Sequence, residues 1–304
     1  MSSDQRPLCL YHKNCLDGIA AAWVAWKAHN GEIDLQAIQY GDPIPVYGGR
    51  RMYVLDFSFK AEMLLVIDSQ CDLVLLDHHD TAAREFERLD LTKLRGHVLV
   101  DENYSGAMLA WRYFFPDVKP PIEIQIVQDR DLWQWKIPQT REWTMAAFSY
   151  PFCVEAFDGL INRGVDSVCS EGFYLNRKNT QDVEKIAKSA RTMIIDGLLF
   201  PVVNANSFFA SDLGTKLSEG HLGAVIYTDT VDGRIFSMRS RKGGFAVNLL
   251  AERFGGGGHP AAAGFKIKFT DRRFKNSHLY LRSKHYWWRR IKGWLGLGSG
   301  NLFQ

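Results

Sequence analysis

Short apolar runs alternate with helical patterns through the first half of the sequence, and this alternation is what most constrains the fold. The runs that indicate β-strands are Leu8–Tyr11, Ile33–Ile38, Met52–Leu55, Leu73–Leu76 and Val98–Val100. Helical spacing of apolar residues predicts helices at Gly18–Ala28, Lys60–Ile67, Ala82–Leu89 and Ser105–Phe115. This order is typical of an α/β fold with a doubly wound, mostly parallel sheet, which binds ligands at the carboxyl ends of its strands.

Four apolar runs end in residue types that bind metals. The most informative is Asp77-His78-His79, which directly follows the buried-strand pattern that ends at Leu76. The other three endings contribute His12 with Asp17, then Asp56, and then Asp129. Carboxylates and neutral imidazoles suit divalent transition metals, and strand ends on one edge of a sheet lie close together. We therefore expect these side chains to converge on one metal-binding crevice.

The second half of the sequence predicts a separate, smaller α/β domain. We place the first domain at residues 1–165, a helical linker rich in Lys, Asp and Glu at 166–200, and the second domain at 201–272. Its expected elements are strands at Ala224–Thr228 and Arg234–Met238 and a helix at Ala246–Phe254. The glycine-rich segment Gly255–Gly264 follows this helix.

Composition excludes several classes of protein. The chain has 304 residues, 46% of them hydrophobic and 23% charged, which is typical of globular domains and not of disordered chains. The first residues lack the pattern of a signal peptide, and no apolar run reaches the length needed to cross a membrane. The five cysteines are scattered without a C-x-x-C pair, which argues against a disulfide framework and favours a reducing, cytoplasmic location.

The excess of positive charge lies at one end of the chain. From Arg272 onward there are eight basic residues and no acidic one, so the body carries about −5 and the basic aromatic tail at 273–304 supplies the positive excess. The spacing of apolar residues in this tail favours packing on the body or self-association as a homodimer. Contact with an acidic surface, a membrane or nucleic acid is the alternative.

Together, Asp77-His78-His79 and the Gly255–Gly264 segment carry a resemblance to a known family. The glycine-rich segment looks like the signature G-G-G-H-x-x-A-A-G, and His12, Asp17, Asp56 and Asp129 match the remaining metal-binding motifs in order. The chain thus resembles the DHH phosphoesterase superfamily with its DHH-associated C-terminal domain, in the oligoribonuclease and exopolyphosphatase-related branch. The resemblance runs from about Leu8 to Phe269.

The resemblance implies an active site with two metal ions, usually manganese, in the cleft between the two domains. His12 would bind the first ion and Asp56 would bridge both. The second ion would be held by Asp17, His78 and Asp129. His79 would act on the substrate phosphate, and Asp77 would orient the neighbouring imidazoles. Asp131 is a rival to Asp129, which we prefer because it directly follows the apolar run.

One motif departs from the family pattern. The usual first motif has the form H-x-x-x-D-x-D, whereas the segment from His12 to Asp17 is one residue shorter and has Cys15 in place of the earlier Asp. As a thiolate, Cys15 would favour zinc, iron or cobalt in the first metal position. The alternative is that Cys15 is only a small buried residue and that the first ion is weakly held.

The second domain supplies candidates for phosphate binding. Consecutive glycines let backbone N–H groups approach an anion closely, and an arginine can bind phosphate with two hydrogen bonds. The candidate substrate-binding residues are Arg239, Ser240, Gly256, Gly257, Gly258 and His259.

The sequence therefore predicts a phosphoesterase with two Mn²⁺ ions that hydrolyses phosphodiester or phosphomonoester bonds of short oligonucleotides or small nucleotides. The enzymatic alternative is an exopolyphosphatase. The non-enzymatic alternative is a nucleotide-binding sensor, favoured by Cys15 at a position where the family has an Asp.

Overall fold

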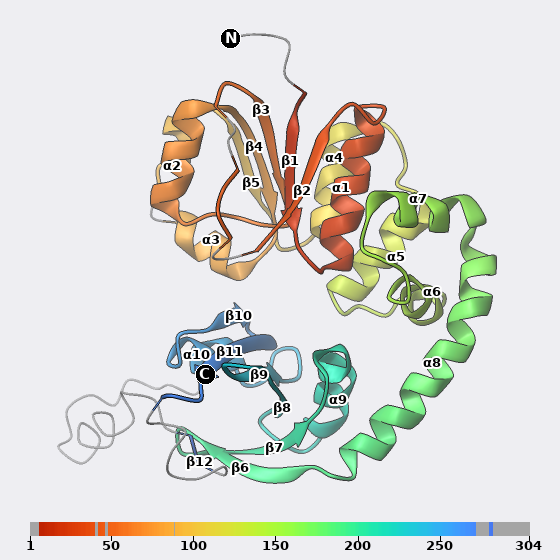
Figure 1. The fold of residues 1–304 in the computed structure, drawn as a ribbon, viewed down its shortest axis with the longest axis vertical. Coiled ribbons are helices and arrows are strands. Elements are labelled where there is room, and N and C mark those ends of the chain that lie inside the picture. Colours follow the sequence, from red (N-terminus) through yellow and green to blue (C-terminus); the bar gives the residue numbers. More distant parts are fainter. Residues whose placement is uncertain (1–5, 40–41, 46–47, 88, 272–279, 282–304) are drawn as a thin grey trace, which may run out of the picture. The chain divides into compact units, whose positions relative to one another are not determined.

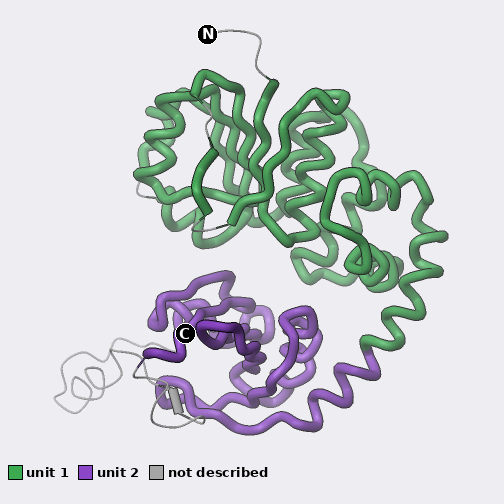
Figure 2. The backbone as a smooth tube through the Cα atoms, viewed as in Figure 1, with its two compact units in different colours: residues 1–179 green, residues 180–304 purple. Residues whose placement is uncertain are grey.

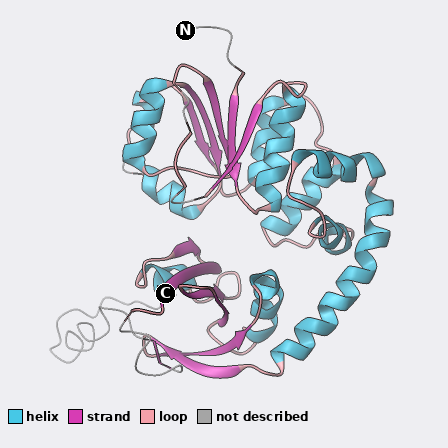
Figure 3. Cartoon of the chain, viewed as in Figure 1, coloured by secondary structure: helices cyan, strands magenta, loops and turns pink. Residues whose placement is uncertain are grey.

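The computed structural model describes residues 6–39, 42–45, 48–87, 89–271 and 280–281. The chain divides into two compact units, residues 1–179 and residues 180–304, which Figure 2 colours separately. Each unit is built around its own β-sheet (Figure 3).

The first unit contains a five-stranded, wholly parallel sheet with the strand order β2-β1-β3-β4-β5 (Figure 1). Its strands are β1 (Leu8–His12), β2 (Asp34–Ile38), β3 (Arg51–Leu55), β4 (Asp72–Asp77) and β5 (His97–Val100). All five predicted strands are present, and the prediction of a mostly parallel α/β sheet is confirmed.

Helices cover both faces of this sheet. Helices α1 (Leu16–Ala28) and α4 (Gly106–Phe114) pack on one face, in the same core as Tyr53 and Leu55 of β3. Helices α2 (Ala61–Gln70) and α3 (Asp80–Phe86) share the opposite core with Met52 and Val54. Successive strand residues point to opposite faces, so a strand covered on both sides must be apolar throughout, as these runs are.

The strand order places a topological switch point beside β1. The chain leaves β1 toward β2 on one side, whereas β3 pairs with β1 on the other side. In open parallel sheets, the crevice for ligands lies at such a point, outside the carboxyl ends of the strands. Here β1 ends at His12, and β3 is followed directly by Asp56.

Two segments differ from the sequence-based expectation. The apolar run at 126–127, which we read like the strand endings, lies within helix α5 (Ile122–Asp131). The linker expected to be helical over 166–200 is helical only as far as the end of α8 (Val165–Ala187), and residues 191–195 form a strand that pairs with the following one. Between α5 and α8 lie α6 (Thr140–Ala147) and α7 (Val154–Arg163).

The second unit contains a mixed sheet with the order β10-β11-β9-β8-β7-β6-β12. Its strands are β6 (Arg191–Ile195), β7 (Leu198–Asn204), β8 (Ala224–Asp229), β9 (Gly233–Arg239), β10 (Gly257–His259), β11 (Ala262–Lys268) and β12 (Tyr280–Leu281). Helices α9 (Ala210–Leu217) and α10 (Val247–Glu252) belong to different core clusters of this unit. Strand β6 and the start of β7 lie in the segment 166–200 that sequence analysis assigned to the linker.

Most of the basic tail at 273–304 lies outside the described residues. The exception is β12, which pairs in parallel with β6. Among the residues that the structure describes, no helix is both long enough and apolar enough to span a membrane.

Candidate metal centre

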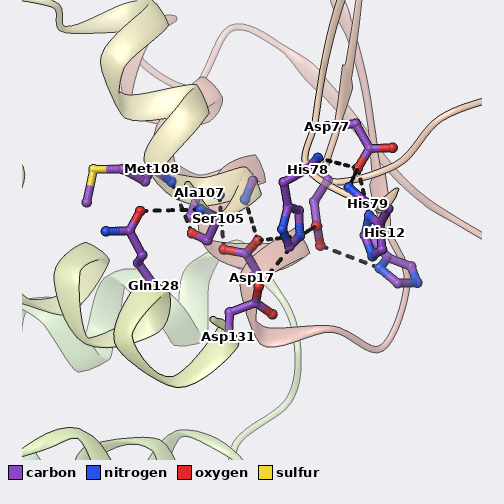
Figure 4. Close-up of polar contacts among 12 residues, drawn as sticks. His12, Asp17, Asp77, His78, His79, Ser105, Ala107, Met108, Gln128 and Asp131 are labelled. Atoms are coloured by element: carbon purple, nitrogen blue, oxygen red, sulfur yellow. Dashed lines mark hydrogen bonds and ion pairs between the residues drawn. The ribbon is translucent and has the colours of Figure 1, made fainter. Parts of the chain in front are cut away.

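A cluster of carboxylates and imidazoles lies at the carboxyl ends of three neighbouring strands of the first unit (Figure 4). His12 is the last residue of β1, Asp56 follows β3, and Asp77 is the last residue of β4. His78 and His79 come directly after Asp77. Parallel pairing of the strands therefore brings together residues that are as far as 67 positions apart in the sequence, as the spacing predicts.

Asp56 is central to the cluster. Its Oδ1 lies 3.0 Å from Nε2 of His78, and its Oδ2 lies 3.5 Å from Nδ1 of His12. The residue has a left-handed backbone with φ of 56°, and its N–H donates to the carbonyl of Leu76 at 3.0 Å. A non-glycine residue in this conformation costs on the order of 1 kcal/mol, and such strain is concentrated at functional sites.

Three sets of side chains in the described part of the chain have ligand atoms close enough to hold a metal ion. Within each set these atoms lie within 4.8 Å of one another. The sets are His12, Cys15 and Asp56; Asp17, His78 and Asp131; and Asp56, His78 and His79. We call the first set the first site and the second set the second site.

Asp17 is held at the start of helix α4. Its carboxylate accepts hydrogen bonds from the N–H groups of Gly106 at 2.5 Å and Ala107 at 3.0 Å. A side chain at Gly106 could not be accommodated, because its Cβ would lie 2.5 Å from Cβ of Asp56. This role of Gly106 and Ala107 was not predicted from the sequence.

Asp77 belongs to none of these three sets and instead accepts hydrogen bonds from its neighbours His78 and His79. Its Oδ1 accepts from Nδ1 of His79 at 2.7 Å and from the backbone N–H of His78 at 2.7 Å. Asp77 is fully buried, whereas the side chain of His79 is 24% exposed. A buried carboxylate that bonds Nδ1 fixes both the orientation and the tautomer of the ring.

The structure brings Asp131 to the cluster, whereas Asp129, which the sequence favoured, is engaged elsewhere. Oδ2 of Asp131 lies 3.5 Å from Nε2 of His78. The carboxylate of Asp129 accepts from the N–H groups of Lys136 at 2.7 Å and Ile137 at 3.2 Å, and from Oγ1 of Thr140 at 2.6 Å. Because both residues lie in helix α5, positions two apart face different sides, so Asp129 shapes the following loop while Asp131 faces His78.

The charges of the cluster shift several of its pKa values. Burial lowers the pKa of His78, but its hydrogen bond to Asp56 and the nearby carboxylates outweigh burial and raise this pKa to about 10. Burial also lowers the pKa of His79, and Asp77 outweighs it, raising the pKa to about 9. Burial and neighbouring carboxylates raise the pKa of Asp17. The carboxylates of the cluster thus outnumber its imidazoles, and a surplus of carboxylates is typical of a site that binds a cation.

The donor atoms of the first site fit a metal ion. Nδ1 of His12 and Oδ2 of Asp56 are both buried atoms without a hydrogen-bond partner, and they face each other at 3.5 Å. Two ligand atoms that are each about 2.0–2.2 Å from one ion lie roughly 3–3.5 Å apart. Burial of unpartnered polar atoms is unfavourable, and a shared cation would satisfy both atoms.

In the second unit, two of the candidate phosphate-binding residues share one row of the sheet. Arg239 of β9 and His259 of β10 are both register partners of Ala262 on the intervening strand β11. The guanidinium of Arg239 donates to the carbonyl of Met238 at 2.9 Å and contacts Oγ of Ser211 at 3.4 Å. The expected active site between the two domains stays a prediction.

The remaining candidates of the second unit lie in β10 or directly beside β9 and β10. Gly257 pairs with Gly264, and Gly258 pairs with Ala263. Gly258 has φ of 134°, and a Cβ at Gly256 would lie 2.0 Å from the carbonyl oxygen of Gly264. Close strand pairing therefore requires glycine at positions 256 and 258. Ser240 donates its backbone N–H to the carbonyl of Ala261 at 2.9 Å, and its Oγ is a buried atom without a hydrogen-bond partner.

Two similarities to known sequences involve this chain. Residues 207–275 match the family model of the DHHA1 domain. The uncharacterized protein R106 of Acanthamoeba polyphaga mimivirus is 28% identical over 290 residues, which cover 86% of this chain and 68% of R106.

Two solved structures share the fold. The pGpG-specific phosphodiesterase PggH from Vibrio cholerae is similar with a TM-score of 0.50 and 16% identity, over 88% of this chain and 95% of that chain. The DHH domain of a member of a family of ribosomal proteins is similar with a TM-score of 0.54 and 15% identity, over 91% of this chain and 88% of that chain. At these identities, the likeness concerns the fold.

Proposed function

We propose that this chain is a metal-dependent phosphoesterase of the DHH superfamily, acting on short oligonucleotides or small nucleotides; the match of residues 207–275 to the DHHA1 domain and the shared fold support this. The observation that carries the proposal is the position of Asp56, whose two oxygens face the first and the second site separately. One carboxylate shared between two ligand sets is the arrangement that a two-metal hydrolase needs.

The chain offers distinct residues for each ion. His12, Cys15 and Asp56 would hold the first ion. Asp17, His78 and Asp131, with the shared Asp56, would hold the second ion, so that Asp131 takes the role that sequence analysis gave to Asp129. Two divalent cations, with Mn²⁺ the first to test, would supply a Lewis acid for the phosphoryl oxygens and lower the pKa of the attacking water.

His79 would complete the site by acting on the substrate. Asp77 accepts a hydrogen bond from Nδ1 of His79, fixes the orientation of the ring and raises the pKa of the imidazole above its ordinary value, which favours the protonated form. A fixed cationic donor stabilises the negative charge that develops on phosphoryl oxygens in the transition state. Asp77 is then a positioning residue, which acts only through His79.

The second unit would bind the remainder of the substrate. Arg239 and His259 offer cationic and hydrogen-bonding groups in one row of the sheet, and both suit a phosphate. This division of labour assigns metal binding to the first unit and phosphate positioning to the second.

Among substrates, a dinucleotide is the first to test, because PggH, which has the same fold, is a pGpG-specific phosphodiesterase. Polyphosphate is the enzymatic alternative. The mildly acidic body of residues 1–271 counts against it, because a long polyanion binds best to an extended basic surface.

The test is a panel of dinucleotides, longer oligonucleotides, cyclic dinucleotides and polyphosphate, incubated with the protein and Mn²⁺. We expect mononucleotide release from dinucleotides by the parent protein and none by the Asp56→Asn variant. Asp68→Asn is a matched control, because Asp68 is also buried in the first unit but accepts hydrogen bonds from Arg95 and Gly96 instead. Orthophosphate release from polyphosphate alone would replace the proposed substrate, and binding of nucleotides without turnover would favour the sensor.

A further inference from the structure

The two sites differ in the chemistry of their donor atoms. The second site offers one imidazole and two carboxylates, in addition to the shared Asp56. The first site offers one imidazole, the carboxylate of Asp56 and the sulfur of Cys15. Oxygen donors suit Mn²⁺, whereas thiolate selects softer ions such as Zn²⁺, Co²⁺ and Fe²⁺.

Helix capping does not explain the presence of a cysteine at position 15. Cys15 is the N-cap of α1, with φ of −121° and ψ of 134°, and its side chain accepts no capping hydrogen bond. Ser, Thr, Asp and Asn are the residues that stabilise this position, and a thiol is a weak acceptor. The sulfur lies instead within 4.8 Å of ligand atoms of His12 and Asp56.

A second cysteine provides an internal comparison. Cys153 is the N-cap of α7, with φ of −133° and ψ of 157°, also without a capping hydrogen bond. Cys15 and Cys153 thus share their backbone position and their partial burial. Only Cys15 belongs to one of the three ligand sets found among the described residues.

An independent observation shows that the first site is built for a ligand. Oδ2 of Asp56, a residue that is only 1% exposed, has no hydrogen-bond partner and is directed toward Nδ1 of His12, which has none either. The sulfur of Cys15 and the ligand atoms of His12 and Asp56 lie within 4.8 Å of one another, so one cation could satisfy all three.

We propose that the metal centre is heterobinuclear: His12, Cys15 and Asp56 bind a thiophilic divalent ion, while the second site binds Mn²⁺. This inference rests on the proposed two-metal function and specifies its metals. When the first ion binds, the S–H bond of Cys15 breaks, the proton passes to solvent, and a sulfur lone pair forms the bond to the metal. No electron is transferred, so no oxidant is required.

The test is titration of the full-length, metal-free protein with Co²⁺, followed by optical absorption. We expect a thiolate-to-cobalt charge-transfer band that saturates at one equivalent in the parent protein and in the Cys153→Ser control. The band should be lost in Cys15→Ser, with circular dichroism used to verify that this variant is folded. Absence of the band from the parent protein, or its persistence in Cys15→Ser, would overturn the proposal.

A competition experiment measures the selectivity itself. Parent protein and Cys15→Asp are equilibrated with Zn²⁺ and Mn²⁺ together, and the bound metals are counted by mass spectrometry. Cys15→Asp should lower the preference of the first site for Zn²⁺ by at least about tenfold. Loss of a residue that only supports a ligand already lowers metal affinity by this much, and Cys15 would be a ligand itself. An unchanged ratio of bound Zn²⁺ to Mn²⁺ would contradict the role of the sulfur.

Neither measurement uses a substrate, so the two proposals can fail separately. A cobalt–thiolate band in a protein that hydrolyses no phosphate ester in any metal form would overturn the proposed function and leave this inference standing. Asp56-dependent hydrolysis by a protein without the band would do the reverse.

Discussion

The two units place their polar groups by different means. In the first unit, all strands run in parallel, so the side chains that follow them meet at one edge of the sheet. In the second unit, β9, β10 and β11 are antiparallel, so their ends alternate, and Arg239 and His259 come together as a row across the strands. The first arrangement concentrates charge in a buried cluster, whereas the second presents separate groups on a sheet. Loss of one group should therefore be far more damaging in the first unit.

The largest effect is expected for Asp56→Asn. This change removes the carboxylate that faces both sites, so the rate of hydrolysis should fall by at least about a thousandfold, since two-metal stabilisation is worth several kcal/mol and each 1.36 kcal/mol is tenfold. Steady-state assays in Mn²⁺ together with metal counting would measure it. A variant that keeps its turnover with both ions bound would remove Asp56 from the centre.

His78→Ala comes next. Nε2 of His78 lies within 3.0–3.7 Å of oxygens of Asp56, Asp17 and Asp131, so the variant loses a ligand and leaves carboxylates without a counter-charge. We expect the bound metal to fall from two ions to one and the activity to fall with it. Equilibrium dialysis followed by metal analysis measures the stoichiometry. Two tightly bound ions in this variant would contradict the assignment.

Asp131→Asn and Asp129→Asn separate a ligand from a structural carboxylate. Asp131→Asn should weaken binding of the second ion by about 10–100-fold or more, because loss of a group that only supports a ligand already costs that much. The melting temperature of the metal-free protein should not change. Asp129→Asn should instead lower stability by about 1.5–3 kcal/mol, the typical worth of a hydrogen bond to a charged group. Thermal melts and metal titrations of both variants distinguish the two roles. Weaker metal binding in Asp129→Asn and lower stability in Asp131→Asn would identify Asp129 as the ligand.

The smallest effect is expected for Arg239→Ala. It should raise KM by about tenfold, the lower end of what a charge-assisted hydrogen bond is worth, and leave metal content unchanged. Arg234→Ala is the matched control, because Arg234 lies on the same strand but pairs with Asp229. If Arg239→Ala lost as much metal as His78→Ala, the second unit would have to help build the metal centre, and the contrast between the units would break down.

The sequence predicted the first sheet well because its physical signal is local. A strand buried on both faces must be apolar over four or five consecutive residues, and the runs at Leu8, Met52 and Leu73 satisfy this requirement. The polar residue that ends such a run is then placed by the topology of the sheet. The positions of His12, Asp56 and His78 at this edge of the sheet could therefore be predicted from the order of residues alone.

Where the structure departs from the expectation, a local pattern was compatible with two structures. The run that ends at Asp129 is short and apolar, which does not distinguish a strand from a helix, and the structure is helix α5. The choice of Asp129 over Asp131 rested on its position directly after that run, and in a helix this position does not decide which of the two carboxylates faces His78. The backbone N–H groups of Gly106 and Ala107 were missed for a different reason, because no residue type marks a backbone donor for a distant carboxylate.

The bond between Asp17 and the start of α4 also has a consequence for the order of folding. Asp17 is separated by 89 positions from Gly106 and by 90 from Ala107, so the contact closes a large loop and forms only after the intervening strands have paired. Until α4 docks, Asp17 is not held in place for the second site. The proposed second site would therefore be completed late in folding, and uptake of an ion there during refolding would time the completion of the first unit.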